Sequence, residues 1–291
     1  MQVWDKRQSV VSLLGASLVF LIAFIVLLEL RAPYGFVVLP ALFASLFYYL
    51  NMRRYFLRKR CAGEVFPPDW RQILEKNVGY YRRLSDPDKR RFEVDVNIFL
   101  RENRITAIDT EIDDRTRLLV ASSAVILTFG RPDWEYKKLP EILIYPRSFD
   151  SDYSTVSHPK RRALAGIVVP QDGIVLAKNE LLQAFTESSE AYHVGLHEFA
   201  HALDLADGRA EGIPNDLDPR IITEWVQLMK SELRRVRQDR SVLDPYAGKN
   251  MSELFAVAVE HFFQRPDELR AQHERLYRAL EEFFHQDPAA R

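Results

Sequence analysis

The sequence predicts a mainly helical α+β protein, with a small β-sheet in its middle and two membrane-spanning helices at its start. Three observations support this fold class. Two apolar runs fill most of residues 1–60, helical periodicity dominates on either side of about 141–177, and β-branched runs are confined to that stretch. We therefore expect a membrane anchor at 1–60 and a second part at 61–291. That part divides into a helical lobe at about 66–135 and a site-bearing region at about 140–288.

The N-terminal apolar runs predict two transmembrane helices, at about 10–30 and 34–51. The first run has no charge before Glu29 and is long enough to cross a hydrocarbon core of about 30 Å. The second is short for a span unless its flanks are included, so one span followed by a membrane-surface segment is an alternative. The length of the first run and the presence of the second argue against a cleaved signal peptide.

A basic cluster directly after the second run predicts the orientation of the anchor. It consists of Arg53, Arg54, Arg58, Lys59 and Arg60. Because lysine and arginine are enriched on the cytoplasmic side of membrane proteins, this cluster places the rest of the chain in the cytoplasm. Two spans then place the N-terminus there too. We therefore expect a two-pass protein of the bacterial inner (cytoplasmic) membrane.

Composition narrows the classes of function. The formal net charge of −1 gives no case for nucleic-acid binding, and we expect no nucleic-acid partner. Cys61 is the single cysteine, which excludes an intrachain disulfide and a cysteine-based zinc or iron–sulfur site. The second part is therefore expected to be an ordinary globular region whose function depends on specific side chains.

Regular secondary structure is expected throughout the second part, from hydrophobic periodicity and from start and stop signals. The expected helices cover about 66–84, 85–100, 113–130, 186–207, 219–237, 251–264 and 266–285. The expected strands cover 141–146, 163–169 and 174–177, the last two joined by a turn at 170–173.

The main functional motif is His197-Glu198-Phe199-Ala200-His201, an HExxH pattern in an apolar segment. On a helix, His197 and His201 project from one face about 6 Å apart. That spacing lets two imidazole nitrogens reach one zinc ion at roughly 2.0–2.1 Å. Glu198 is turned by about 100° and could accept a proton from a zinc-bound water. The motif predicts a zinc-dependent peptidase. A core helix with hydrogen-bonded histidines is the alternative.

Two further residues share the face of the two histidines. Asp204 lies three residues after His201, and we expect it to orient a ligand imidazole rather than to bind the metal. His193 lies one turn before His197 and is either an outer contact of the site or only helix surface.

The third ligand of a catalytic zinc must come from elsewhere, since such sites use three protein ligands and leave one position for water. Glu253 and Glu260 are seven residues apart on one expected helix, so they share a face and either could complete the set. Glu253 also lies three residues after Asn250, which makes a capping-box glutamate its alternative role.

Several segments resemble a known family, and they follow one another along this chain in the same order as in that family. They are LHEFAHALD (Leu196–Asp204), DGRAEGIP (Asp207–Pro214), DPYAGKNMSELFAVAVEHFF (Asp244–Phe263), FPPDWRQIL (Phe66–Leu74) and ILIYPRSF (Ile142–Phe149). Together they resemble the Mlc titration factor A family of zinc peptidases, whose site is related to the anthrax lethal factor catalytic domain. The resemblance covers about residues 64–288 and implies a zincin-like metallopeptidase fold.

By residue-by-residue matching, the resemblance implies that His197, His201 and Glu253 bind Zn²⁺ and that Glu198 is the general base. Tyr246, seven residues before Glu253, matches a tyrosine that hydrogen-bonds the oxyanion of the tetrahedral intermediate. A tyrosine that only packs a turn after proline is the alternative. The implied function is a membrane-anchored metallopeptidase acting on a peptide or protein substrate, with the family's aminopeptidase activity as a lead.

The family also implies a function of another class, because its name comes from sequestering a glucose-responsive transcriptional repressor. The alternative is therefore a membrane-tethered protein that binds a cytosolic transcriptional regulator. Two departures from the family are expected to matter. Soluble members lack the N-terminal spans, and the family usually has asparagine where His193 stands, which predicts a changed metal affinity or pH dependence.

Overall fold

The structure is a computed structural model that describes residues 1–31, 33, 36, 38–136, 139, 141–147, 166–169, 173–186 and 192–290. It divides into two compact units. The first is Gln2–Val65, and the second is Phe66–Arg291 together with Met1.

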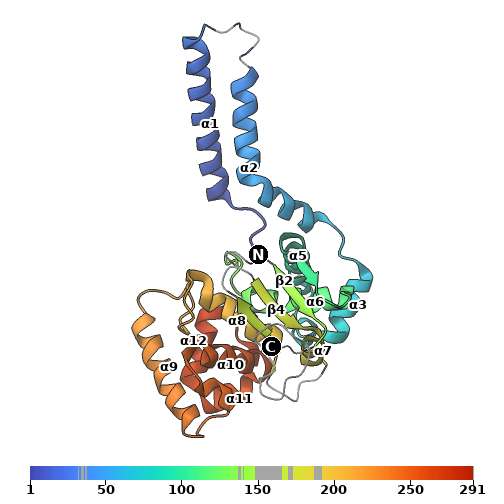
Figure 1. Ribbon diagram of the computed structural model, residues 1–291, viewed down its shortest axis with the longest axis vertical. Helices are drawn as coiled ribbons and strands as arrows, with labels where there is room; N and C mark the ends of the chain where they lie inside the picture. The colour runs from blue at the N-terminus through green and yellow to red at the C-terminus, as the bar shows by residue number, and fades with distance from the viewer. Residues whose placement is uncertain are drawn as a thin grey trace. The chain divides into compact units, whose positions relative to one another are not determined.

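The first unit is a helical hairpin in which α1 (Lys6–Glu29) and α2 (Val38–Gly63) pack side by side (Figure 1). Asp5 caps α1 by accepting hydrogen bonds from the backbone nitrogens of Arg7 at 2.8 Å and Gln8 at 3.1 Å. Among the described residues, α1 alone is long and apolar enough to cross a membrane by length and composition, whereas the sequence predicts two such helices. The second half of α2 carries the basic cluster, which lowers its hydropathy.

The described residues of the second unit form a four-stranded sheet in the order β1-β2-β4-β3. The strands are β1 (Ile105–Ala107), β2 (Ile142–Tyr145), β3 (Gly166–Val169) and β4 (Gly173–Ala177). β1, β2 and β4 are parallel, and β3 runs antiparallel to β4 at one edge. The strand expected at 141–146 and the pairing of the next two are confirmed, while their turn at 170–172 lies outside the described residues. The sequence did not predict β1, because three residues carry too little pattern.

The N-terminal helices of this unit are α3 (Pro68–Asn77), α4 (Gly79–Arg82), α5 (Asp86–Glu102) and α6 (Asp114–Thr128). A single helix over 66–84 is wrong, because Val78 adopts an extended conformation between α3 and α4. The break lets the buried Tyr81 hydroxyl donate to Glu93 of α5 at 2.6 Å. The expected starts of the next two helices are confirmed, since Ser85 and Asp113 are their N-cap residues and each accepts a backbone hydrogen bond.

The remaining helices are α7 (Lys178–Ala184), α8 (Val194–Asp204), α9 (Ile222–Arg237), α10 (Met251–Gln264), α11 (Pro266–Gln272) and α12 (Glu274–Phe284). One helix over 266–285 is wrong, because His273 leaves the helical conformation with φ −136° and ψ 52°. Its ring instead contacts Glu232 of α9 at 2.5 Å. The short 3₁₀ segments are η2 (Leu205–Asp207), η3 (Pro245–Gly248) and η4 (Pro288–Ala290).

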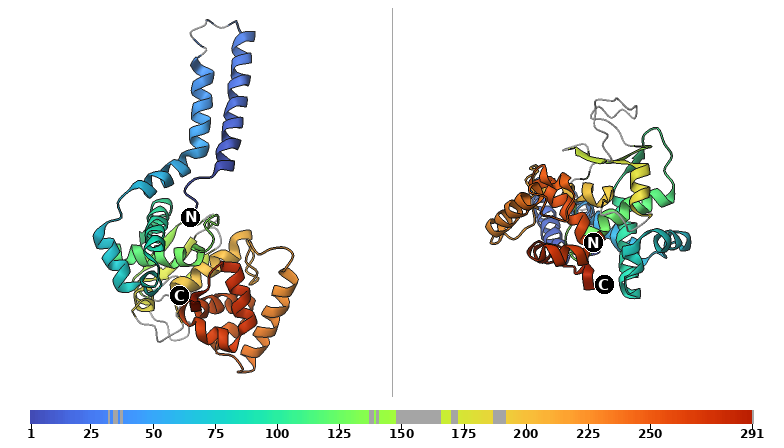
Figure 2. Two further views of the ribbon diagram at one scale, coloured as in Figure 1. Left: turned by 180° about the vertical axis from the view of Figure 1, so that it is seen from behind. Right: turned by 90° about the horizontal axis from the view of Figure 1, so that it is seen from below.

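The α8 helix is central to this unit. It packs against α6, β3 and β4, and against α10 of the C-terminal helices α9–α12, which gather in one part of the unit (Figures 1 and 2). Ser252–Phe263 of α10 are all buried, and Phe199, Ala200 and Leu203 bury the apolar positions of α8. The HExxH segment is therefore held between the sheet and the C-terminal helices.

Candidate metal centre

The first turn of α8 differs from the sequence expectation. The sequence predicts a helix start near Thr186–Glu190, but Thr186 follows α7, and α8 begins at Val194. Residues 187–191 lie outside the described residues. His193 is the N-cap residue, and its Nδ1 accepts a hydrogen bond from the backbone nitrogen of Leu196 at 3.1 Å. His193 is therefore a cap rather than a member of the helix face, and it is fully buried.

Three side-chain atoms converge on one point between α8 and α10. The Nε2 atoms of His197 and His201 are 3.1 Å apart, and each lies 3.2 Å from Oε2 of Glu253. Ligands of a tetrahedral zinc at 2.0–2.1 Å would be roughly 3.3 Å from one another. These three residues form a group that could hold a metal ion. The donor set of two imidazoles and one carboxylate therefore fits a divalent cation, and borderline-soft zinc in particular.

Glu260 lies on the other nitrogen of His197. Its Oε1 is 2.7 Å from Nδ1 of His197, and its Oε2 accepts a 2.5 Å hydrogen bond from the backbone nitrogen of His193. Glu253 and Glu260, seven residues apart on α10, thus contact opposite sides of the same imidazole. A carboxylate hydrogen-bonded to Nδ1 fixes the orientation of the ring and leaves Nε2 available for a metal ion. Histidines that bind metals usually have such a partner on their other ring nitrogen.

Asp204 supports His201 through an intermediate residue. Nδ1 of His201 is 3.1 Å from the Ser252 hydroxyl, which in turn donates to Oδ2 of Asp204 at 2.6 Å. Asp204 also accepts the backbone nitrogens of Gly212 and Ile213, both at 2.9 Å. Gly212 has φ +69°, and a Cβ there would meet the Met251 carbonyl oxygen at 2.3 Å, so this loop requires glycine. The sequence pointed to Asp204 but gave no signal for Ser252.

Glu198 is buried beside the edge strand β3. A Cβ on Gly166 of β3 would lie 2.6 Å from Oε1 of Glu198, so glycine allows this close approach. Oε2 of Glu198 has no hydrogen-bond partner within the described part of the chain. Burial raises the pKa of the Glu198 carboxyl, and the charges of His197 and His201 oppose that rise. A carboxyl of raised pKa suits proton transfer near neutral pH.

The second oxygen of Glu253 is also engaged. Oε1 accepts hydrogen bonds from the Tyr246 hydroxyl at 3.0 Å and from Nζ of Lys249 at 2.7 Å. Burial alone would raise the pKa of Glu253, but hydrogen bonds from His197, His201 and Lys249 hold it well below the usual range. Asn250 caps α10 by accepting the Glu253 backbone nitrogen at 2.8 Å, while the Glu253 side chain points to the histidines. The Tyr246 hydroxyl therefore lies next to the candidate ligand Glu253, as the sequence predicts. The sequence does not predict the contact of Lys249 with Glu253.

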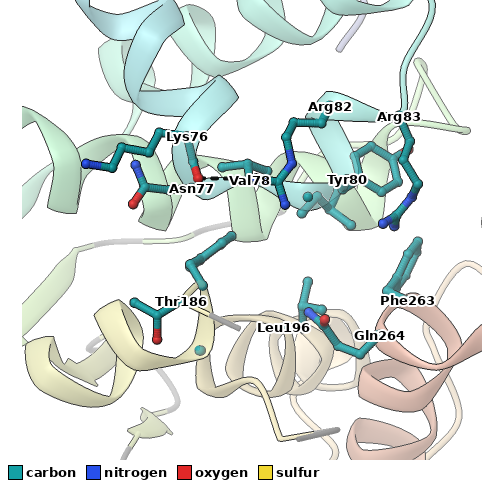
Figure 3. Close-up of a pocket in the computed structure, with 14 residues that line it drawn as sticks. Lys76, Asn77, Val78, Tyr80, Arg82, Arg83, Thr186, Leu196, Phe263 and Gln264 are labelled. Carbon is teal, nitrogen blue, oxygen red and sulfur yellow. Dashed lines mark hydrogen bonds between the residues drawn. The ribbon is translucent and has the colours of Figure 1, made fainter. Parts of the chain in front are cut away.

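A separate cavity of about 270 Å³ borders α8 and α10 at other residues. It lies between Leu196 and Phe263 on one side and Arg82 and Arg83 on the other (Figure 3). None of the candidate ligands lines it, so the metal centre and this cavity are distinct features of the unit.

Comparison with known proteins identifies the family. Residues 52–285 match the family described as glucose-regulated metallo-peptidase M90. An uncharacterized protein of Synechocystis sp. is 29% identical over 242 residues, covering 79% of this chain and 88% of that protein. Mlc titration factor A of Pectobacterium atrosepticum is 32% identical over 228 residues, covering 72% of this chain and 83% of the relative. Mlc titration factor A of Yersinia enterocolitica is 26% identical over 238 residues, covering 76% and 86%. Because the match spans most of the chain and includes the HExxH helix and α10, this chain belongs to the M90 metallopeptidase family.

Proposed function

We propose that this protein is a membrane-anchored zinc metallopeptidase that hydrolyses peptide bonds. The observation that carries the proposal is the convergence of His197, His201 and Glu253 within 3.1–3.2 Å of one another. The buried carboxylate of Glu198 lies on the same helix next to this cluster. Membership of a metallopeptidase family supports the same reaction class.

In the proposed mechanism, His197, His201 and Glu253 would hold a zinc ion, which would supply a bound water of lowered pKa and a Lewis acid for the scissile carbonyl. Glu198 accepts the proton of the attacking water and delivers it to the leaving amine. The Tyr246 hydroxyl turns from Glu253 to the developing oxyanion and donates a hydrogen bond to it. Glu260 and the Ser252–Asp204 pair keep the two imidazoles oriented throughout.

We propose that both helices of the first unit cross the membrane and that the second unit is cytoplasmic. Apolar side chains of α2 face outward as those of α1 do, including Leu42 at 59% and Phe43 at 57% exposed. The basic end of α2 supports a cytoplasmic position for the second unit. Alkaline phosphatase, which is active only outside the cytoplasm, is expected to be active when fused after Arg31 and inactive after Arg291.

A second candidate function is supported by the names of the relatives. Mlc titration factor A denotes a protein named for an effect on Mlc, so this chain is proposed to hold a cytosolic transcriptional regulator at the membrane. The two functions are separable by experiment. Capture of such a regulator by both wild type and His201→Ala would show binding that does not depend on the metal site.

The proposed peptidase is tested directly with a peptide library. Full-length protein purified in detergent and supplied with zinc is expected to cleave a subset of peptides, and a chelator is expected to stop it. Product masses distinguish internal cleavage from removal of N-terminal residues, the aminopeptidase form of the proposal. A zinc-loaded, folded protein that cleaves no peptide would favour the binding function.

A further inference from the structure

Lys249 places its ammonium group between two residues of the metal centre. Its Nζ lies 2.7 Å from Oε1 of Glu253 and 3.2 Å from the Tyr246 hydroxyl, and 5.1 Å from the centre of the Tyr246 ring. Lys249 belongs neither to the HExxH motif nor to the positions of the third ligand and the tyrosine, yet it contacts both Glu253 and Tyr246.

The backbone around Lys249 is fixed from a different helix. Arg237, at the end of α9, donates to the carbonyl oxygens of Gly248 at 2.8 Å and Lys249 at 3.3 Å. On either side, Asp244 accepts the backbone nitrogen of Tyr246 at 2.7 Å and Asn250 caps α10. The position of the ammonium therefore does not depend only on its own flexible side chain.

The two oxygens of Glu253 consequently have different surroundings. Oε2 faces the two histidine nitrogens, and Oε1 is held by Lys249 and Tyr246. We propose that Lys249 is a positioning residue that makes Glu253 a ligand through one oxygen only. This inference rests on the proposed zinc site. Holding Oε1 away keeps the fourth coordination position open for water, which a carboxylate bound through both oxygens would occupy.

Charge supports the same role. Glu198, Glu253 and Glu260 bring three buried carboxyl groups to a site where both ligand histidines are neutral when they bind metal. The ammonium of Lys249 adds positive charge beside these carboxyl groups without taking a coordination position. Loss of an outer partner of a metal ligand typically costs 10- to 100-fold in metal affinity or activity.

The test compares Lys249→Met with Lys249→Arg in the full-length protein in detergent. Methionine keeps an apolar stem without the charge, and arginine keeps the charge. Zinc Kd is measured by competition with a chromophoric chelator, and kcat and KM are measured on a cleaved peptide.

Lys249→Met is expected to weaken zinc binding about 10- to 100-fold and to lower kcat more than it changes KM. Lys249→Arg is expected to restore most of the loss. Lys230→Met, an exposed position on α9, is the matched control.

Replacing zinc with Co²⁺ allows the coordination number of the metal to be followed by visible absorption. A lysine that only stabilised the fold would not change this spectrum. The Co²⁺ form of Lys249→Met is expected to show weaker visible absorption than wild type, as five-coordinate cobalt absorbs less than four-coordinate cobalt. Unchanged zinc Kd, kcat and cobalt spectrum in Lys249→Met would overturn the role of Lys249 while leaving the peptidase intact. Wild type that binds no zinc would overturn both proposals. Since the Lys249 side chain is 54% exposed, its replacement should not prevent folding.

Discussion

Two clusters in the second unit combine buried histidine with buried glutamate, yet their geometries differ. In the metal cluster (His197, His201 and Glu253), three ligand atoms converge within 3.1–3.2 Å. In the clamp (Ser241, Glu232 and His273), the contacts run in a line. Nδ1 of His273 is 2.5 Å from Glu232, and its Nε2 is 3.1 Å from the Ser241 hydroxyl.

The difference indicates how a structural cluster can be told from a candidate metal site. In the clamp, each ring nitrogen has its own partner, so ordinary hydrogen bonds satisfy the whole line. In the metal cluster, the Nδ1 atoms already have outer partners, and both Nε2 atoms point at one carboxylate oxygen. That arrangement concentrates lone pairs at one point, where a single cation would satisfy all three atoms at once. Burial and residue types alone would not separate the two clusters.

The largest expected effect is on turnover and comes from Glu198→Gln. This change removes the proton acceptor but none of the three candidate ligands, so peptide turnover should fall by about 10²- to 10⁴-fold while zinc remains bound. Steady-state kinetics and metal content of the same sample check this outcome. Glu224→Gln, an exposed position on α9, serves as control. Retained turnover in Glu198→Gln would remove Glu198 from the mechanism.

The next effect separates the two glutamates of α10. Glu253→Gln should weaken zinc binding by more than about 100-fold, because it removes a ligand. Glu260→Gln should weaken it by only about 10- to 100-fold, because it removes an outer contact of His197. Zinc competition titrations measure both values. The reverse order would make Glu260 the ligand and contradict the geometry.

A substitution in the clamp is expected to lower the unfolding free energy without changing the zinc content. Glu232→Ala leaves Nδ1 of the buried His273 without its carboxylate partner and should cost about 3–5 kcal/mol of unfolding free energy. Urea unfolding followed by circular dichroism measures the loss, with Glu224→Ala as the exposed control. Zinc content should stay at the wild-type level under conditions where the variant is folded. Loss of zinc from Glu232→Ala without a loss of stability would contradict the conclusion that the clamp is structural and the other cluster binds the metal.

The smallest effect depends on pH and concerns His193. Burial lowers the pKa of His193 to about 4, whereas an unfolded histidine titrates near 6.5. Between these values the unfolded chain binds more protons, so stability is lost as pH falls from about 6.5 toward 4, by up to about 3 kcal/mol. Asparagine also caps helices well, so His193→Asn should keep the cap and lose less stability over this range.

Unfolding free energies of wild type and His193→Asn at several pH values give the comparison. Near pH 8 both proteins have a neutral cap, so any difference there reports packing alone. Parallel curves from pH 8 to pH 4 would show that His193 does not carry the acid sensitivity.

Local patterns in the sequence predicted part of the site. The HExxH spacing places both histidines on one helix face because four residues make about one turn, and α8 bears this out. The extent of α10 also matched its pattern. Periodicity alone left Glu253 and Glu260 equivalent, and only the resemblance to a family favoured Glu253.

The other features of the site depended on contacts between distant segments. Ser252 and Lys249 gain their roles from His201 and Glu253, and a serine or lysine near the start of a helix carries no such signal by itself. The helix breaks at Val78 and His273 let Tyr81 and His273 reach buried glutamates, so tertiary partners overrode local propensity. His193 was misplaced because its role depends on where α8 begins.

The most direct measurement is the zinc content of purified full-length protein, beside His201→Ala and His273→Ala. The two substitutions remove one histidine each, from the metal cluster and from the clamp. We predict about one zinc per chain in wild type and in folded His273→Ala, and its loss in His201→Ala. A folded wild type without zinc, or zinc retained in His201→Ala, would contradict the assignment of the metal centre.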